Sequence, residues 1–438
     1  MIAVLRRSKA MHNFGWLVAD RGVRLLVGIV IGSWVARYLG KQDFGLLAYA
    51  LALATIFAAL TPMGMDALVV REIIRDPRQG GRWIGTTIAF RGLAAILASL
   101  LGLLFSIGLR PGDTRIWAMV AILGAGTLFQ TLESGELWFQ AHTRMQRLVL
   151  PRLLLFSAMS CLKVVAVLRG AGVIWFSVLT ALEQVVSGVL TLVIARHALG
   201  AANPLVFRPE LGWRILRKSW PLAISAISVI LYLKLAQLIL SGLMGDASLG
   251  IYAAAIRIPE AATFLPMVLA SSLLPSLLRS REEGPRIYQL ALQRFFRINA
   301  LLALSICIPV SLAAPWLIRI LYGPTFAEAG PILAVYVWSL LFAFLGVARG
   351  QHLLNELLTR LPLWFSGFGL AVNLVACVVL IPRFGAMGAA VSTVVSSFAS
   401  AFLSSFIHPK TRIVGRQQWL ALLTPWRIGS LAGVSDGI

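Results

Sequence analysis

The chain has 438 residues, of which 59% are hydrophobic and only 13% are charged, and its mean hydropathy is +0.85. Soluble domains keep about 25% charged residues, so this composition excludes a water-soluble protein and predicts an integral membrane protein. The formal net charge of +22 would suggest nucleic acid as a partner of a soluble chain. In a membrane protein, the concentration of Lys and Arg in cytoplasmic loops is the first explanation to test.

The first apolar segment, WLVADRGVRLLVGIVIGSWVARYLG at 16–40, contains Asp20, Arg21 and Arg24. It is too long and too charged for a cleaved signal peptide, so we interpret it as the first membrane span. Asp20 and Arg24 are four residues apart and therefore share a helix face. Two readings stay open for them: an ion pair that braces the helix, or an arginine that is available to an anion.

Apolar runs of about 20 residues are long enough to cross about 30 Å of hydrocarbon. The sequence contains twelve such runs, at 14–36, 44–66, 84–108, 116–139, 149–168, 172–195, 219–243, 251–278, 298–320, 329–351, 361–381 and 385–407. Between them, 26 Lys and Arg residues fall on the side of the N-terminus and 7 on the opposite side. This bias predicts that both termini are cytoplasmic, and it explains most of the net charge without nucleic acid.

An internal similarity links the two halves of the chain. The second span is entered through LGKQDFGLLAYA (39–50) and the eighth through MGDASLGIYAAA (244–255), and a shift of 205 residues places Gly40 on Gly245 and Gly45 on Gly250. Six spans per half is an even number, so both halves insert in the same direction, as a parallel repeat with its axis along the membrane normal. We predict a cytoplasmic N-terminus, an N-lobe, a cytoplasmic inter-lobe loop, a C-lobe and a cytoplasmic tail, at 1–13, 14–197, 198–217, 218–407 and 408–438.

Charged residues within the spans are the candidate site residues, because each Lys or Arg at the bilayer centre costs about 2.5–3.5 kcal/mol on insertion scales. Arg21 and Arg91 lie near cytoplasmic helix ends and are expected to snorkel. The others indicate a wet interior that contains Arg24, Lys163, Lys234 and Arg257 as bases and Asp20, Glu133, Glu136, Glu183 and Glu260 as acids.

Among the bases, Lys163 has two open interpretations: a substrate contact, or a structural ion pair with Glu136 or Glu183. Arg24, Lys234 and Arg257 are the preferred anion-binding candidates. A diphosphate suits such a set, because several cations can share its charge in a cleft of low dielectric. The acids Asp20, Glu136, Glu183 and Glu260 would support these bases or couple transport to an ion.

Four stretches together resemble the polysaccharide and O-antigen flippases (Wzx type) of the MATE-like multidrug/oligosaccharidyl-lipid/polysaccharide (MOP) exporter superfamily. They are ARYLGKQDFGLLAYA with GMDALVVREIIRDP, GELWFQAHTRMQRLVLPRLLLFSAMSCLKVVAVL, LYLKLAQLILSGLMGDASLGIYAAAIRIPE, and IPRFGAMGAAVSTVVS. In the resemblance, Glu136, Lys163, Glu183, Lys234 and Arg257 fall where such proteins usually carry the same or similar charge. Many relatives have an acid where this chain has Ala236, which weakens the case for ion coupling on that helix.

The resemblance implies an all-α, two-lobed MATE-like bundle of twelve transmembrane helices, with a central cationic cavity that opens alternately to each side. It implies a substrate of undecaprenyl-diphosphate-linked oligosaccharide, moved across the bacterial inner membrane for O-antigen or exopolysaccharide assembly. The partners would be this polyprenyl-diphosphate-linked glycan, membrane lipid, and a polysaccharide polymerase with chain-length proteins. No cofactor is expected, and a proton or sodium gradient is a candidate driving force. Twelve spans argue against the fourteen-span lipid II flippases.

Two alternatives are weighed against this interpretation. A MATE-type multidrug exporter would favour acids in the cavity, yet bases outnumber acids within the spans by six to five. A membrane glycosyltransferase or polymerase would need a large outer loop, yet the longest loop is short and basic, and the outer acids Asp113, Asp246 and Glu328 are isolated in sequence. No nucleophile–base constellation or metal cluster is recognisable, so the sequence predicts a non-enzyme.

Overall fold

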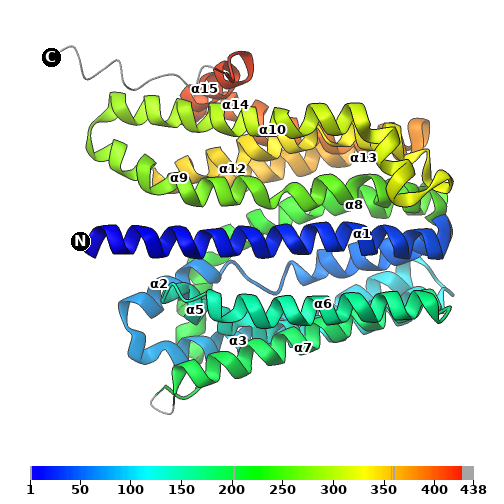
Figure 1. Cartoon of the computed structure of the whole chain (residues 1–438), viewed down its shortest axis with the longest axis horizontal. Helices are drawn as coiled ribbons and strands as arrows, with labels where there is room; N and C mark the ends of the chain where they lie inside the picture. Colours follow the sequence, from blue (N-terminus) through cyan, green and yellow to red (C-terminus); the bar gives the residue numbers. More distant parts are fainter. Residues whose placement is uncertain (1, 201–202, 357, 359–360, 427–438) are drawn as a thin grey trace. The chain divides into compact units, whose positions relative to one another are not determined.

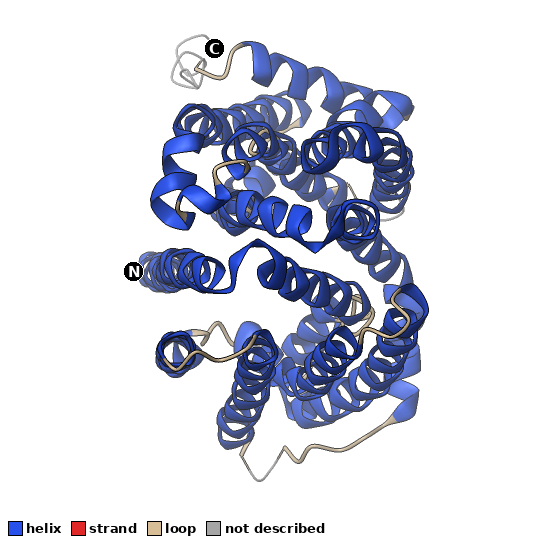
Figure 2. Cartoon of the chain, turned by 90° about the vertical axis from the view of Figure 1, so that its right-hand side faces the viewer, coloured by secondary structure: helices blue, strands red, loops and turns tan. Residues whose placement is uncertain are grey.

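The structure is a computed structural model of the chain, and it describes residues 2–200, 203–356, 358 and 361–426. Helices make up nearly all of the described residues, which contain no strand (Figure 2). Eight of the described helical stretches are long and apolar enough to cross a membrane. The predicted all-α membrane architecture is therefore confirmed, while the count of twelve crossings stays a prediction.

The chain divides into two compact units, Met1–Ala253 and Ala254–Ile438, which we call unit 1 and unit 2. This division falls within a long helix, whereas the predicted lobes meet in the loop at 198–217; the lobe boundaries stay a prediction. Unit 1 contains α1 (Ile2–Ala58), α2 (Asp66–Arg75), η1 (Pro77–Gln79), α3 (Gly80–Leu109), α4 (Thr114–Gln130), η2 (Thr131–Gly135), α5 (Glu136–Ala141), α6 (Gln146–Leu168), α7 (Val173–Leu199) and the larger part of α8 (Pro209–Ala262).

Unit 2 contains the end of α8 and the remaining helices. These are α9 (Phe264–Glu282), α10 (Pro285–Tyr322), η3 (Pro324–Phe326), α11 (Ala329–Tyr336), α12 (Ser339–Asn355), α13 (Leu361–Phe398), η4 (Ala399–Leu403), α14 (Ser404–Ile407), η5 (Pro409–Thr411) and α15 (Arg412–Leu423). Within unit 2, α10 packs against α9, α11, α12 and α15, and α13 packs against α11 and α12 (Figure 1). The helix α15 lies in the predicted cytoplasmic tail, and its Trp419 is half exposed.

In unit 1, α4 packs against α1, α3 and α7, and α6 runs beside α7 (Figure 1). The predicted second span, 44–66, is too long, because α1 ends at Ala58 and a turn with Pro62 and Gly64 follows. Proline lacks an N–H and glycine permits the positive φ of 64° found there, so the helix cannot continue through these residues. The result is a short helix, α2, that folds back over α3 and α5.

Two glycines at equivalent places bend the long helices α1 and α8. Gly40 has φ 73° and ψ 177°, and Gly245 has φ 80° and ψ 170°. A positive φ strains residues that have a Cβ, so glycine suits both positions. The shift of 205 residues seen in the sequence therefore relates two bends of nearly the same backbone conformation.

Five residues beyond each bend, α1 and α8 touch through their backbones. A Cβ built on Gly45 would overlap the carbonyl oxygen of Asp246, and one built on Gly250 would overlap the carbonyl oxygen of Lys41. The two contacts are reciprocal, since the shift of 205 residues turns Gly45–Asp246 into Gly250–Lys41. Because small residues let membrane helices approach closely, this contact sets the spacing of α1 and α8 in unit 1.

We predict that Gly250→Ala weakens unit 1 by about 1–3 kcal/mol, because the added methyl group meets backbone that has no rotamer to change. The measurement is the apparent melting temperature of the purified protein in detergent, which should fall. Gly242→Ala is the matched control, since a Cβ at Gly242 of the same helix would meet nothing within 4 Å. Equal melting temperatures for the two variants would contradict the close approach.

Candidate functional site

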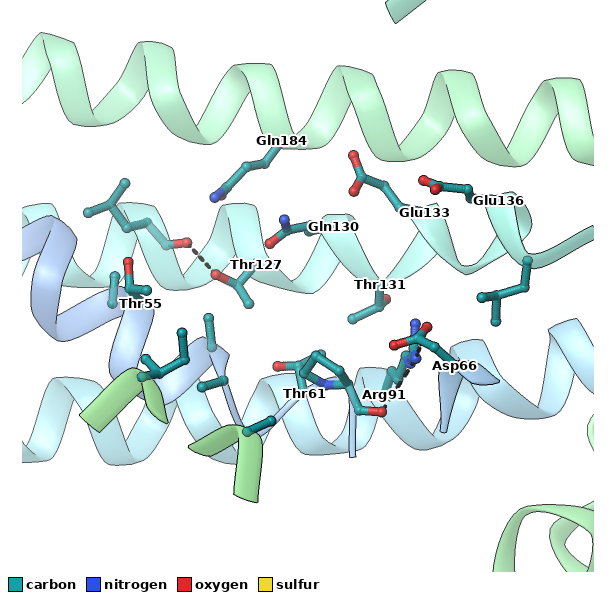
Figure 3. A pocket seen from close by; sticks show the side chains of 18 of the residues that line it. Thr55, Thr61, Asp66, Arg91, Thr127, Gln130, Thr131, Glu133, Glu136 and Gln184 are labelled. Carbon is teal, nitrogen blue, oxygen red and sulfur yellow. Dashed lines mark hydrogen bonds and ion pairs between the residues drawn. The ribbon is translucent and has the colours of Figure 1, made fainter. Parts of the chain in front are cut away.

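Unit 1 encloses a polar cavity of about 610 Å³, formed by α1, α2, α3, α4, η2, α5, α7 and α8 (Figure 3). The turn after α1 and the first residue of α2 form one wall, and α8 contributes Ala226 and Ile230. The polar residues that line the cavity are Thr55, Thr61, Asp66, Arg91, Thr127, Gln130, Thr131, Glu133, Glu136, Gln140 and Gln184. So many hydrogen-bonding groups within apolar helices make this cavity the candidate site for a polar ligand.

Arg91 is the basic residue of this lining, and it does not snorkel. The residue is 8% exposed, and its Nη2 lies 2.6 Å from Oδ1 of Asp66 (Figure 3). Nη1 donates to the Ser134 hydroxyl at 3.1 Å, and Nη2 also donates to the Pro62 carbonyl at 3.4 Å. For Arg91 the snorkelling prediction was wrong, because the turn after α1 and the helix α2 close over the guanidinium and supply its partners. The side chain of Arg21 lies outside the described residues, so its snorkelling stays a prediction. Pro62 and Gly64 mark the turn in the sequence, but no local pattern predicts that α2 then packs over α3 and α5.

The three carboxylates of the lining all have partners. Asp66 pairs with Arg91, and Glu136 lies 2.6 Å from Nη1 of Arg152. Glu136 also accepts a hydrogen bond from the Gln140 amide at 2.9 Å, while Glu133 accepts one from the Ser187 hydroxyl. Two of the three negative charges are thus compensated by arginines, which reduces the net charge that the cavity offers to a ligand.

The cavity also contains polar atoms that no described residue satisfies. Oε1 of Gln184 and Oγ1 of Thr61 are buried and have no hydrogen-bond partner among the described residues. Figure 3 shows Gln184 from α7 close to Gln130 and Thr127 of α4. A buried polar atom that lacks a partner costs about 1–3 kcal/mol, so these atoms require a water or ligand group to complete them.

Of the bases predicted from sequence, Lys163 forms a structural pair. Its Nζ donates to Glu183 at 2.7 Å, across α6 and α7. The open alternative of a Lys163–Glu183 pair is therefore confirmed, whereas pairing with Glu136 was wrong because Arg152 occupies that carboxylate. Neither Lys163 nor Glu183 lines the cavity of unit 1.

The remaining predicted residues are not brought together in one described site. Arg24 is half-buried on α1, with its guanidinium carbon 5.7 Å from the Phe156 ring centroid. The side chain of Asp20 lies outside the described residues, so its pairing with Arg24 stays a prediction. Lys234 is half-buried in unit 1; Arg257, which is exposed, and Glu260, which is half-buried, belong to unit 2. Their roles stay predictions.

Two of the predicted outer acids, Asp113 and Asp246, contact the same arginine, Arg110, so they are not isolated from charged partners. Both carboxylate oxygens of Asp246 accept hydrogen bonds from the Arg110 guanidinium, at 2.6 and 2.8 Å, and Asp113 lies 3.8 Å from the same group. The Arg110 guanidinium also lies 4.3 Å from the Tyr49 ring centroid. The hydrogen bond to the Asp246 carboxylate raises the pKa of Arg110 above its ordinary value. An arginine between two acids makes an ion pair, and it leaves no free carboxylate pair for acid–base chemistry.

At a sequence shift of 213 residues, Glu136, Arg152 and Thr191 of unit 1 correspond to Arg349, Phe365 and Ser404 of unit 2. In unit 1, Arg152 contacts Glu136 and the Thr191 hydroxyl. At the corresponding positions in unit 2, the Arg349 guanidinium lies 4.3 Å from the Phe365 ring centroid and donates to the Ser404 hydroxyl at 2.7 Å. An arginine links the three positions in each unit, but it is Arg152 in unit 1 and Arg349, the equivalent of Glu136, in unit 2.

The family of the chain follows from comparison with known proteins. Residues 10–281 match the model of a family described as polysaccharide biosynthesis protein. The chain belongs to this family. A relative named probable flippase AglR, from Haloferax volcanii, is 25% identical over 90% of this chain and 81% of its own length.

Solved structures show that this polysaccharide biosynthesis protein has the MOP superfamily fold. The lipid II flippase MurJ, in an inward closed conformation, superposes with a TM-score of 0.67 at 12% identity, over 95% of this chain and 93% of its own. An inward-facing MATE family multidrug resistance transporter superposes with a TM-score of 0.62 at 15% identity, over 93% and 96%. The resemblance to Wzx-type flippases is confirmed, and the chain is a multi-pass membrane protein of this family.

We predict that Lys163→Met alone lowers stability, because it leaves the partly buried Glu183 carboxylate without its cation. The double variant Lys163→Met/Glu183→Leu should recover most of the loss, since an apolar pair can replace an ion pair at little cost. Melting temperatures of both variants and of the wild type measure this. A substrate-binding role for Lys163 would instead abolish transport in the double variant while stability recovers.

Proposed function

We propose that this polysaccharide biosynthesis protein translocates an undecaprenyl-diphosphate-linked oligosaccharide from the cytoplasmic to the periplasmic leaflet of the bacterial inner membrane. The product would supply assembly of O-antigen or exopolysaccharide. Family membership and the relative named probable flippase support a transport role in glycan assembly. The observation that carries the choice of substrate is the chemistry of the cavity in unit 1.

That cavity offers neutral hydrogen-bonding groups of the kind that sugar hydroxyls need. Its amides are Gln130, Gln140 and Gln184, and its hydroxyls come from four threonines. An amide both donates and accepts, as a sugar hydroxyl does. The hydroxyls of Thr55, Thr127 and Thr131 already donate to backbone carbonyls, so they offer their oxygens as acceptors. Oε1 of Gln184 lies against Gly126 without a hydrogen-bond partner, and it would accept a hydrogen bond from the glycan once the side chain turns into the cavity. A volume of about 610 Å³ has room for a few sugar rings.

The runner-up is a MATE-type exporter of cationic drugs, and one observation favours it. Three carboxylates line the cavity against one arginine, Arg91. Because Arg91 compensates Asp66 and Arg152 compensates Glu136, only Glu133 lacks an arginine partner among the described residues. A single such carboxylate is a weaker cation site than the lining suggests at first count. Transport of a cationic dye with no translocation of lipid-linked glycan would support the exporter.

The diphosphate would be bound by Arg24, Lys234 and Arg257, which are the predicted anion-binding bases that remain after Lys163 is assigned to Glu183. Their contacts with substrate would form as the transporter alternates between its two open states. The orientation proposed from the loop charges places both termini in the cytoplasm. A proton or sodium gradient would drive the cycle, and a polysaccharide polymerase with chain-length proteins would consume the product.

We predict that the triple variant Arg24→Ala/Lys234→Ala/Arg257→Ala loses export of polysaccharide, because three cations would no longer share the charge of the diphosphate. The measurement is surface glycan in a strain that depends on this gene, with membrane-inserted protein quantified in parallel. Full export by the triple variant at normal protein levels would refute the cationic site.

A second variant tests the glycan cavity itself. We expect Gln184→Leu to raise the half-saturating concentration of lipid-linked oligosaccharide several-fold in proteoliposomes, since a lost hydrogen bond is worth about 1 kcal/mol. Gln146→Leu is the matched control, because Gln146 is exposed at the start of α6 and outside the cavity. If the two variants have the same kinetics, Gln184 does not contact the substrate.

A further inference from the structure

The first turns of α8 border an open hollow that is separate from the cavity described above. The hollow measures about 550 Å³ and is lined by Glu210, Trp213, Arg214, Arg217 and Lys218. It shares no lining residue with the cavity that contains Arg91. Neither the family match nor the proposed transport cycle gives these residues a role.

The hollow is built on a fixed base within unit 1. The backbone of Gly212 packs on Phe90 of α3 so closely that a Cβ at Gly212 would overlap the phenyl ring. Ile215 is 4% exposed, in a cluster that includes Trp83, and the Ser219 hydroxyl donates to the Met63 carbonyl at 2.8 Å. Positions 212, 215 and 219 share the inward face of the helix, which leaves the basic residues on the outward face.

The outward face carries an excess of two positive charges, from three cations and the single carboxylate of Glu210. Arg214, Arg217 and Lys218 are exposed, and no ion pair between described residues holds any of them. Aromatic rings of unit 1 contact two side chains that line the hollow. The Arg214 guanidinium lies 5.5 Å from the Trp83 ring, and Trp213 meets Phe90 edge-on at 5.9 Å.

The sequence places this hollow at the level of lipid headgroups. The apolar run of α8 begins at 219, directly after Lys218, and the preceding loop is predicted to be cytoplasmic. Trp213 and Trp220 are 57% and 51% exposed, and seven residues separate them, so they lie on one side of the helix about 10 Å apart along its axis. Exposed tryptophans flanked by Lys and Arg are typical of the membrane–water interface.

We propose that this hollow is a docking site for the diphosphate of a lipid-linked substrate in the cytoplasmic leaflet, occupied before the substrate enters the transporter. The proposal rests on the proposed function. The excess of two positive charges matches the two negative charges of a diphosphate diester, whereas a phosphodiester headgroup carries one. The arginine guanidiniums can each bind phosphate oxygens through two parallel hydrogen bonds, and the lysine adds a point charge.

The test uses the purified full chain in detergent and measures lipid binding by native mass spectrometry. The probes are undecaprenyl diphosphate, which lacks the sugar and as a monoester has one further ionisable oxygen, and phosphatidylglycerol as an ordinary anionic lipid. In the variant Arg217→Gln/Lys218→Gln, we expect the dissociation constant for undecaprenyl diphosphate to rise about tenfold. The constant for phosphatidylglycerol should stay within about twofold of wild type.

The matched control is Arg286→Gln/Arg294→Gln, which removes two exposed cations of α10 from the same predicted face. We expect this control to bind undecaprenyl diphosphate like the wild type. Equal losses in the two double variants would overturn the proposal in favour of general surface charge. Equal losses of diphosphate and phosphatidylglycerol binding in Arg217→Gln/Lys218→Gln would overturn it in favour of an ordinary phospholipid site.

A translocation assay separates failure of this site from failure of the proposed function. In proteoliposomes that contain lipid-linked oligosaccharide, the Arg217→Gln/Lys218→Gln variant should need a higher substrate concentration for half-maximal rate than the control. A wild-type protein that translocates, with both variants alike, would overturn the docking site alone. A wild-type protein that binds neither undecaprenyl diphosphate nor the glycan, and translocates nothing, would overturn the proposed function and the site with it.

Discussion

The backbone contact between α1 and α8 at Gly45 and Gly250 is the constraint on which unit 1 depends. It holds the start of the second sequence half against the first half at a spacing that no side chain could fit. Towards its N-terminus, α8 includes Ile230 and Ala226, which form part of the cavity wall. Near the start of the same helix, the Ser219 hydroxyl donates a hydrogen bond to the Met63 carbonyl in the turn after α1. Helices from both sequence halves therefore contribute to the cavity wall.

Charge within the helices serves mainly to fix one helix against another. Four ion pairs of unit 1 each join two different elements: Arg91 with Asp66, Arg152 with Glu136, Lys163 with Glu183, and Arg110 with Asp246. In hydrocarbon an unpaired charge is costly, so each pair specifies one arrangement of its helices and penalises the alternatives. The same pairs leave amides and hydroxyls as the groups with remaining hydrogen-bonding capacity, and these groups are the basis of the proposed glycan site.

Hydropathy and glycine positions predicted much of the fold, because spans and bends are local properties of the sequence. The repeat that placed Gly40 on Gly245 anticipated two bends with matching dihedral angles. The fold-back after Ala58 and the burial of Arg91 were not predicted, because they depend on α2 packing over α3 and α5. Partners such as Arg110 and Asp246 are 136 residues apart, and only the tertiary arrangement shows that they meet.

The shift of 213 residues relates a Glu136–Arg152 contact in one unit to an Arg349–Phe365 contact in the other. An acid in the first repeat thus corresponds to a base in the second, and a base corresponds to an aromatic ring. The corresponding positions therefore keep a side-chain contact but differ in charge, so the two units offer different electrostatics at the same place in their helix order.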